Sequence, residues 1–314
     1  MESIIVASNV VLPLIVLIAI GYMANSLRWV STESFTQMNK LVFNVLLPCV
    51  LFDNVCSLSI EEIVNPKHLL FGLGSILALF LCGIPVARAL TEEPLKRGVA
   101  LQAIFRSNFV LYGFPIVLSV YPRERIGPTT VLLAVIVPLF NILSVIALEM
   151  FQSVKADALK ILINICKNPL IIGTALGILC SVTGFALPQI IRGALSNLTA
   201  AATPVALIVL GGTFRRQTVG QNKKILAMLS VIKLLIVPAV FLCIAILLGF
   251  RDVELLALVA LFGSPAAVSS FSMAQQMGAD SELAGQNLVF STVFSIFTIF
   301  IWVSLLNHFS FIVK

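Results

Sequence analysis

Residues 98–122 read GVALQAIFRSNFVLYGFPIVLSVYP, a run of 25 residues that contains one charge, Arg106. A helix of about 20 apolar residues is long enough to cross the ~30 Å hydrocarbon core of a bilayer. Pro115 lies near the middle of the run, where it removes a backbone N–H donor and clashes with the carbonyl four residues earlier. Asn108 and Gly113 lie close by. The stretch therefore predicts a transmembrane helix that is broken near its centre.

The rest of the chain consists of similar apolar blocks. Of its 314 residues, 59% are hydrophobic and 11% are charged, whereas a soluble domain carries about 25% charged residues. Ten blocks carry at most one charge each: 3–27, 41–60, 68–87, 98–122, 126–148, 168–191, 193–214, 225–250, 255–279 and 283–313. The sequence predicts an all-α polytopic membrane protein with ten transmembrane helices.

This composition excludes a soluble enzyme, a disordered chain and a disulfide-stapled secreted domain. A β-barrel does not fit either, because its strands alternate polar and apolar residues and these blocks do not. The first block is an alternative candidate for a cleaved signal peptide, but only Met1 and Glu2 precede it and neither is cationic. The 6 cysteines form no CxxC pair and mostly lie in apolar runs, where they are expected to act as small packing residues.

Lysine and arginine are distributed unevenly between alternate loops. The loops on the side of the termini carry six of the 20 cations, the other loops carry twelve, and Arg106 and Lys233 lie inside blocks. The positive-inside rule makes the twelve-cation side cytoplasmic. We therefore expect a plasma-membrane or inner-membrane protein with both termini outside, and we interpret the net charge of +6 as an orientation signal, not as a nucleic-acid interface.

Prolines inside the blocks indicate an internal repeat. Pro13, Pro48, Pro85 and Pro115 match Pro169, Pro204, Pro238 and Pro265 at offsets of 156, 156, 153 and 150 residues. Residues 1–155 and 156–314 are therefore predicted to be two five-helix repeats. Because five is odd, the second repeat enters the membrane from the opposite face, which gives the inverted topology that is typical of secondary transporters.

The fourth and ninth helices are predicted to be the broken pair. Proline favours the first helical turn, so the second half of each is expected to begin near Pro115 or Pro265. A helix N-terminus carries roughly half a positive charge and open N–H groups. Two such ends that face each other at the midplane favour an anion. Ordinary proline kinks, with serines bonded to their own helix, are the alternative interpretation.

Several short motifs resemble those of the auxin efflux carrier family over essentially the whole chain. They are Asn108-Phe-Val-Leu-Tyr-Gly-Phe-Pro115, Asn39-Lys-Leu-Val-Phe43 with Pro48, Ala202-Thr-Pro204 with Gly211-Gly212, and Ser264-Pro-Ala-Ala-Val268 with Gln286. The resemblance implies a scaffold domain, a transport domain that bears crossover helices, a homodimer, and elevator-type export or exchange of organic anions. The short fifth loop, around 152–160, is similar to that of prokaryotic members.

The candidate substrate-binding residues lie around the two breaks: Asn108, Tyr112, Gly113, Pro115, Ser264, Pro265 and Ser269. An asparagine side chain supplies donors and an acceptor to unwound backbone without a buried charge. A purely structural role for Asn108, in which it satisfies loose backbone, remains open at this point.

Three charged residues are candidates for a relay or coupling role. Arg106 and Lys233 each lie eight residues into their blocks, at a depth from which both could instead extend to the cytoplasmic surface. Asp53 lies near the outer end of its block and is either interfacial or a coupling carboxylate.

Function classes other than a carrier are weighed on the same residues. A sodium-coupled symporter would favour carboxylates near the breaks, and there are none in the middle of either block. A channel or a membrane sensor on the same scaffold is a further alternative. An enzyme is not expected, because the 2 histidines, His68 and His308, lie far apart and no nucleophile or metal cluster is evident. No cofactor, metal or nucleic-acid partner is expected; the expected partners are a small organic anion and the lipid bilayer.

Overall fold

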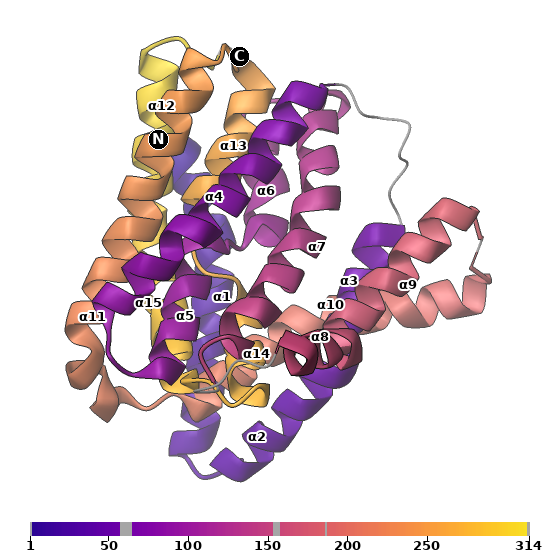
Figure 1. The fold of residues 1–314 in the computed structure, drawn as a ribbon, viewed down its shortest axis with the longest axis vertical. Coiled ribbons are helices and arrows are strands. Elements are labelled where there is room, and N and C mark those ends of the chain that lie inside the picture. Colours follow the sequence, from indigo (N-terminus) through magenta and orange to yellow (C-terminus); the bar gives the residue numbers. More distant parts are fainter. Residues whose placement is uncertain (1, 57–64, 153–157, 186, 313–314) are drawn as a thin grey trace.

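The computed structural model describes residues 2–56, 65–152, 158–185 and 187–312, and within these ranges it contains helices and no strand (Figure 1). The helices of the first half are α1 (Glu2–Ser26), α2 (Thr32–Leu41), α3 (Leu47–Cys56), α4 (Pro66–Leu90), α5 (Pro94–Phe105), α6 (Phe109–Leu118) and α7 (Gly127–Glu149). Those of the second half are α8 (Ala158–Lys167), α9 (Pro169–Thr183), α10 (Gln189–Thr213), α11 (Val219–Val231), α12 (Val237–Leu247), α13 (Asp252–Gly263), α14 (Val268–Gln276) and α15 (Ser281–His308). The prediction of an all-helical chain is confirmed for these residues.

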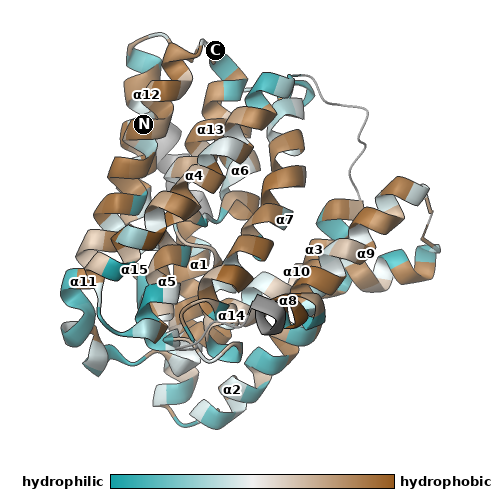
Figure 2. Cartoon of the chain, viewed as in Figure 1, coloured by the Kyte–Doolittle hydropathy of each residue, from teal (hydrophilic) through white to brown (hydrophobic). Residues whose placement is uncertain are grey.

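Eight helices or helix pairs are long and apolar enough to cross a bilayer. They span Thr32–Cys56, Pro66–Leu90, Pro94–Leu118, Gly127–Glu149, Gln189–Thr213, Arg216–Leu247, Asp252–Gln276 and Ser281–His308. Two further apolar helical stretches, Val11–Ser26 of α1 and Pro169–Thr183 (α9), fall in the remaining two predicted blocks. Figure 2 shows brown, hydrophobic residues along most of these helices. The chain is a multi-pass membrane protein, and the count of ten crossings stays a prediction.

Two of the eight spans are interrupted. The first stops at Phe105 and resumes at Phe109, and the second stops at Gly263 and resumes at Val268. The backbone N–H of Asn108 donates to the carbonyl of Pro265 at 2.7 Å, so each interruption supplies a hydrogen-bonding partner to the other. A freed backbone group inside a membrane protein needs such a partner.

The expected starting points of the second half-helices are wrong by several residues. The helix α6 begins six residues before Pro115, which lies inside it. A helix can hold an internal proline when it gives up one hydrogen bond, so the missing N–H did not decide where the helix breaks. Pro265 lies within the second interruption and contributes its carbonyl, while α14 begins three residues later.

Two other spans contain a π-helical turn and are not interrupted. A π-helical turn covers Val42–Leu46 between α2 and α3, and another covers Ile232–Ile236 between α11 and α12. Each ends two residues before a proline, Pro48 or Pro238. Since proline cannot donate to the carbonyl four residues back, a local π turn is one way to rearrange the hydrogen bonds of an otherwise continuous helix.

Close helix pairs join residues from the two halves of the sequence. The helices α1 and α10 approach so closely that a Cβ on Gly21 would lie 1.9 Å from the carbonyl oxygen of Ile208, and one on Gly211 would lie 1.9 Å from that of Ile18. The helix α3 packs on α9, and α10 also packs on α2 and α3. In Figure 1, α3 and α9 lie to the right of the tall bundle that includes α4, α7, α11 and α15.

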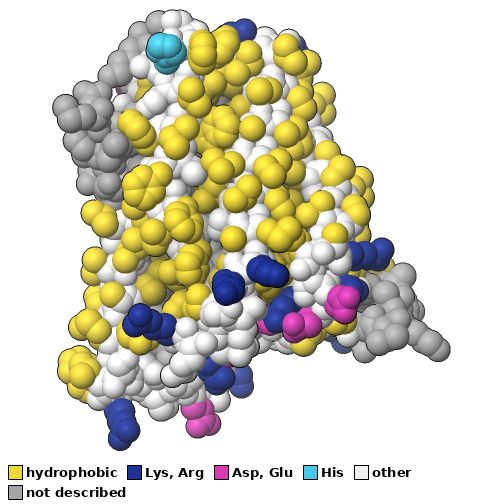
Figure 3. Space-filling model, turned by 90° about the vertical axis from the view of Figure 1, so that its left-hand side faces the viewer, with side chains coloured by type: hydrophobic (Ala, Val, Ile, Leu, Met, Phe, Trp, Pro, Cys, Tyr) yellow, Lys and Arg dark blue, Asp and Glu magenta, His cyan; other side chains and the backbone are white. Residues whose placement is uncertain are grey.

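Large apolar side chains are exposed on the surface. Leu70, Leu81 and Phe297 expose more than 60% of their area, 67%, 63% and 63% respectively. Figure 3 shows hydrophobic side chains over the upper part of one face and most of the visible lysines and arginines at its lower end. This distribution matches a hydrocarbon-facing band with a cationic rim.

Candidate functional site

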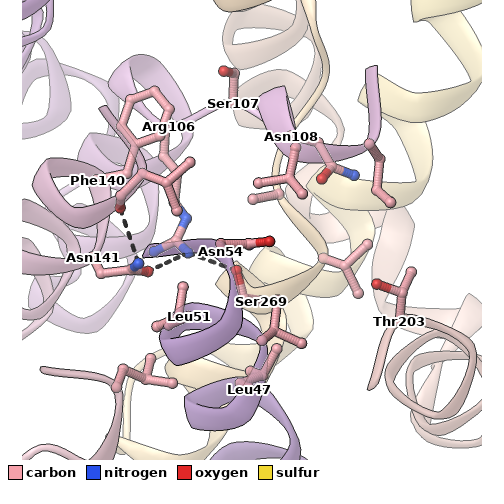
Figure 4. A pocket seen from close by; sticks show the side chains of 17 residues that line it. Leu47, Leu51, Asn54, Arg106, Ser107, Asn108, Phe140, Asn141, Thr203 and Ser269 are labelled. Carbon is pink, nitrogen blue, oxygen red and sulfur yellow. Dashed lines mark hydrogen bonds between the residues drawn. The ribbon is translucent and has the colours of Figure 1, made fainter. Parts of the chain in front are cut away.

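A cavity of about 80 Å³ lies where the first interruption meets α3, α7 and the N-terminus of α14 (Figure 4). Its polar lining comes from several elements: Asn54, Arg106, Ser107, Asn108, Asn141, Thr203 and Ser269. The rest of its lining is mostly aliphatic, including Leu47, Leu51 and Val137. None of the described residues that line it is an aspartate or a glutamate.

Arg106 is the cation of this cavity. It is the C-cap residue that follows α5, and its extended backbone takes it out of the helix. The guanidinium donates from Nη2 to Ser269 Oγ at 2.6 Å and to Asn141 Oδ1 at 2.8 Å, and from Nη1 to Ser144 Oγ at 2.7 Å and Met273 Sδ at 3.0 Å. Figure 4 shows the guanidinium between Asn141 and Ser269.

The alternative in which Arg106 extends to the cytoplasmic surface is therefore wrong. The side chain is only 5% exposed, and all four of its hydrogen bonds go to neighbouring helices. That alternative assumed that the first half of the broken helix ran past Arg106 towards Pro115, whereas the helix ends at Phe105 and the backbone of the next residue is extended.

No carboxylate is paired with Arg106 among the described residues. Its four partners are neutral, so a full positive charge is buried without an opposite charge beside it. Burial of a charge is unfavourable unless it is paired as well as hydrogen-bonded, and the effective penalty is several kcal/mol per ion. An anion in the adjacent cavity would remove that penalty.

Four buried polar atoms, all in residues that line the cavity, have no hydrogen-bonding partner within the described chain. They are Asn54 Nδ2, Arg106 Nε, Ser107 Oγ and Asn108 Nδ2. Three of these are nitrogen donors and the fourth is a hydroxyl that can donate. Buried polar groups are normally satisfied, so these four groups give the surroundings of the cavity an unused capacity to donate hydrogen bonds.

Two helix N-termini border the same cavity. Asn108 is the N-cap of α6 and Ala267 that of α14, and neither cap side chain bonds the first turn. Val110, Val268 and Ser269, from those first turns, are part of the cavity lining. The positive ends of the two helix dipoles therefore add to the charge of Arg106.

The predicted site residues fall into two groups. Asn108 and Ser269 line the cavity, and Pro265 bonds the backbone of Asn108. The others have other surroundings: Tyr112 Oη lies 3.5 Å from Ser295 Oγ, Gly113 packs on Phe109, and Ser264 Oγ donates to the carbonyl of Ala260 in its own helix. Pro115 lies inside α6 and outside the cavity lining.

A second cavity, of about 210 Å³, shares Asn54, Val110 and Val137 with the first. Its lining is mainly apolar, with Phe114 and Leu133 among the larger side chains. Asp53 and Thr130 are the other polar residues on it. Asp53 is thus placed beside the second cavity and not in the first.

Lys233 lies elsewhere, in the π-helical turn between α11 and α12. That turn packs against α5, α13 and α15. The side chain is 2% exposed, so the alternative in which it extends to the surface is wrong, and no carboxylate pairs with it among the described residues. A fully buried lysine without a counter-charge is unusual, and it does not line either cavity.

Sequence reasoning missed Asn54, Asn141, Ser144 and Thr203. Asn141 was detectable as a single amide inside the apolar block 126–148, which is an expensive position unless the group has a partner. Thr203 belongs to the Ala202-Thr-Pro204 motif. The sequence contained no signal that would bring these residues to Arg106, because they come from other helices.

Comparisons with known proteins agree with this architecture. A family described as "Membrane transport protein" matches residues 6–303. A protein of Rhizobium meliloti (strain 1021) named "Putative malonate transporter" is 24% identical over 307 residues, which cover 93% of each chain. An "Uncharacterized transporter" of Methanothermobacter thermautotrophicus is 22% identical over 300 residues, which cover 94% of this chain and 97% of the relative.

Proposed function

The chain belongs to the membrane transport protein family, which is the family of the auxin efflux carriers that its motifs resemble. From this premise, we propose that it is a secondary carrier of small organic anions. The anion binds as a carboxylate beside Arg106. The family and the two relatives are described as transporters and not as enzymes. The malonate named for one relative is a small carboxylate, which supports the proposed substrate class.

The observation that carries the proposal is the buried, unpaired charge of Arg106 beside four unsatisfied polar atoms. A carboxylate presents two acceptor oxygens with several lone pairs, so it can accept from Arg106 Nε, Asn108 Nδ2 and Asn54 Nδ2 together. A cation would be repelled by the positive guanidinium and by the positive ends of two helix dipoles. A neutral amide carries no negative charge, so it would leave the positive charge of Arg106 uncompensated.

We propose that the fold is an inverted repeat of two five-helix halves with α5–α6 and α13–α14 as its crossover helices. The matched interruptions and their hydrogen bond support this arrangement. The scaffold would consist of α1–α3 and α8–α10, and the transport domain of α4–α7 and α11–α15. Elevator movement of one against the other would then expose the cavity alternately, and the resemblance supports a homodimer.

The orientation remains as the cation count suggests, with both termini outside the plasma or inner membrane. Cysteine labelling from outside on a cysteine-free background tests it: a cysteine at Arg123 should react and one at Gln217 should not.

For the coupling of transport, facilitated exchange or proton-linked movement is preferred, with Asp53 and Lys233 as candidate coupling residues. A sodium-coupled symporter is the alternative, and a sodium-dependent ligand affinity would favour it. Counterflow in vesicles separates any carrier from a channel or sensor.

The direct test is a thermal-shift titration of the purified protein with malonate and with its neutral diamide. We expect malonate to stabilise the protein and the diamide to have little effect. Arg106→Gln should abolish the malonate shift, yet raise the unfolding temperature of the free protein because it removes a buried unpaired charge. Arg192→Gln, which removes an exposed cation, is the matched control. Equal binding of the acid and its diamide would overturn the proposal.

A further inference from the structure

The helices α3 and α9 approach each other through a G-x-x-x-G pair. A Cβ on Gly173 would lie 2.6 Å from the carbonyl oxygen of Pro48, and one on Gly177 would lie 2.8 Å from that of Phe52. No side chain larger than hydrogen fits at either position without a shift. Small residues of this spacing let two membrane helices bring their backbones into contact.

One turn further along each helix, this close approach brings two cysteines together. Cys180 follows Gly177 by three residues and Cys56 follows Phe52 by four. Their sulfur atoms lie 2.7 Å apart, although the two residues are 124 positions apart in the chain. The Cys180 thiol also lies 3.3 Å from the carbonyl oxygen of Phe185. The sulfurs need only a small shift to reach the ~2.05 Å of a disulfide bond.

We propose that Cys56 and Cys180 form a disulfide that joins the outer ends of α3 and α9. Disulfides persist in oxidising compartments, and the uneven cation distribution places these helix ends outside. The inference therefore rests on the proposed orientation of the protein, but not on the identity or charge of its substrate.

The bond forms by thiol–disulfide exchange with an external disulfide oxidant. The thiolate of Cys56 attacks one sulfur of that oxidant, which forms a mixed disulfide and releases one thiolate. The thiolate of Cys180 then attacks the Cys56 sulfur and releases the second thiolate. The two cysteine thiols are oxidised, the oxidant is reduced to two thiols, and the two protons lost by the protein end on those thiols.

The cross-link has a structural consequence for the site. Cys56 follows Asp53 by three residues and Asn54 by two; Asn54 lines both cavities and Asp53 lines the second. A disulfide at the end of this short helix fixes α3 against α9 and limits fraying of the turn that carries Asn54. The remaining cysteines, Cys49, Cys82, Cys166 and Cys243, have no sulfur partner within the described chain and serve as internal controls.

The experiment is differential alkylation of the full-length protein in intact cells. Cells are quenched with acid, and free thiols are blocked with light N-ethylmaleimide under denaturing conditions. Disulfides are then reduced and labelled with the heavy reagent. Mass spectrometry should find the heavy label on Cys56 and Cys180, and the light label on the other four of the 6 cysteines.

Single variants identify the partner. In Cys56→Ser, Cys180 should change from the heavy to the light label, whereas Cys82→Ser should leave both heavy. Oxidised wild-type protein should also unfold at a higher temperature than reduced protein, and Cys180→Ser should abolish that difference. Light label on both cysteines of the wild type overturns the proposal, even when a variant fails to accumulate. Malonate binding to the reduced protein tests the transport proposal separately.

Discussion

The two interrupted spans have the same backbone design and different chemistry. The α5–α6 interruption carries Arg106, Ser107 and Asn108, each of which lines the cavity and has an unsatisfied polar atom. The α13–α14 interruption, Ser264–Ala267, turns its only side-chain hydroxyl back to its own helix and offers the carbonyl of Pro265. The Asp252–Gln276 span is also the more enclosed, with 94% of its 18-residue apolar window buried against 72% for that of Pro94–Leu118.

This difference indicates a division of labour between the two interrupted spans. The first interruption supplies the side chains that would bind an anion, and the second supplies backbone, a helix N-terminus and the hydroxyl of Ser269. Two spans that are interrupted in a similar way therefore need not contribute equally to one site. The three predictions below test this division, from the largest expected effect to the smallest.

The largest effect on binding is expected when a negative charge is introduced into the second interrupted span, Asp252–Gln276. Ser269 Oγ lies 2.6 Å from Arg106 Nη2, so Ser269→Asp places a carboxylate beside the guanidinium. The internal ion pair should weaken malonate binding by at least about 30-fold, the equivalent of ~2 kcal/mol, because the cavity charge is already compensated. The free protein should unfold at a higher temperature. Isothermal titration and thermal unfolding measure the two effects.

Ser269→Asn is the matched control, since it has the same size without the charge. It should retain most of the affinity that the aspartate variant loses. Wild-type affinity in Ser269→Asp would show that Arg106 does not bind the anion.

The sequence predicted the broken spans well, and it predicted the direction of their side chains poorly. Ten apolar blocks and the matched prolines indicated the membrane fold and the two interrupted helices. Arg106 was visible as an intramembrane cation, but its inward direction depends on the helix ending at Phe105, and no residue pattern marked that end. Pro115 was the more obvious signal, and it lies inside α6.

The partners of Arg106 could not be predicted because they depend on helix packing. Asn141 and Ser144 come from α7, and Ser269 and Met273 from α14. A single sequence gives the apolar faces of these helices but not their rotation about the axis. The pair Cys56 and Cys180 is hidden for the same reason, since it depends on the contact that Gly173 and Gly177 permit.

A smaller effect is expected from Asn108→Ala. The backbone N–H of Asn108 keeps its bond to Pro265, and the side-chain Nδ2 has no partner to lose, so the fold should be retained. Loss of one hydrogen bond to a charged ligand should weaken binding by about 10-fold or more, from ~1.5–3 kcal/mol. Transport into proteoliposomes should fall far more than expression. The exposed Asn44→Ala is the control, and a transport rate above about half of normal would assign Asn108 a structural role only.

The smallest effect on binding is expected from the serines of the two interruptions, Ser107 and Ser264. Comparing them tests the division of labour most directly. Ser107 is one of the residues that line the cavity, and its Oγ has no partner among the described residues, whereas Ser264 Oγ is bonded to the carbonyl of Ala260. Ser107→Ala should therefore weaken malonate binding about 3- to 10-fold, the value of one neutral hydrogen bond of ~0.5–1.5 kcal/mol, with little change in unfolding temperature. Ser264→Ala should leave the affinity within about twofold and lower the unfolding temperature slightly, because its bond lies within the protein. Each variant is the other's control, since both remove one hydroxyl from an interrupted span. Equal losses of affinity in the two variants would mean that both interruptions contact the anion, and the division of labour between the two interrupted spans would then be wrong.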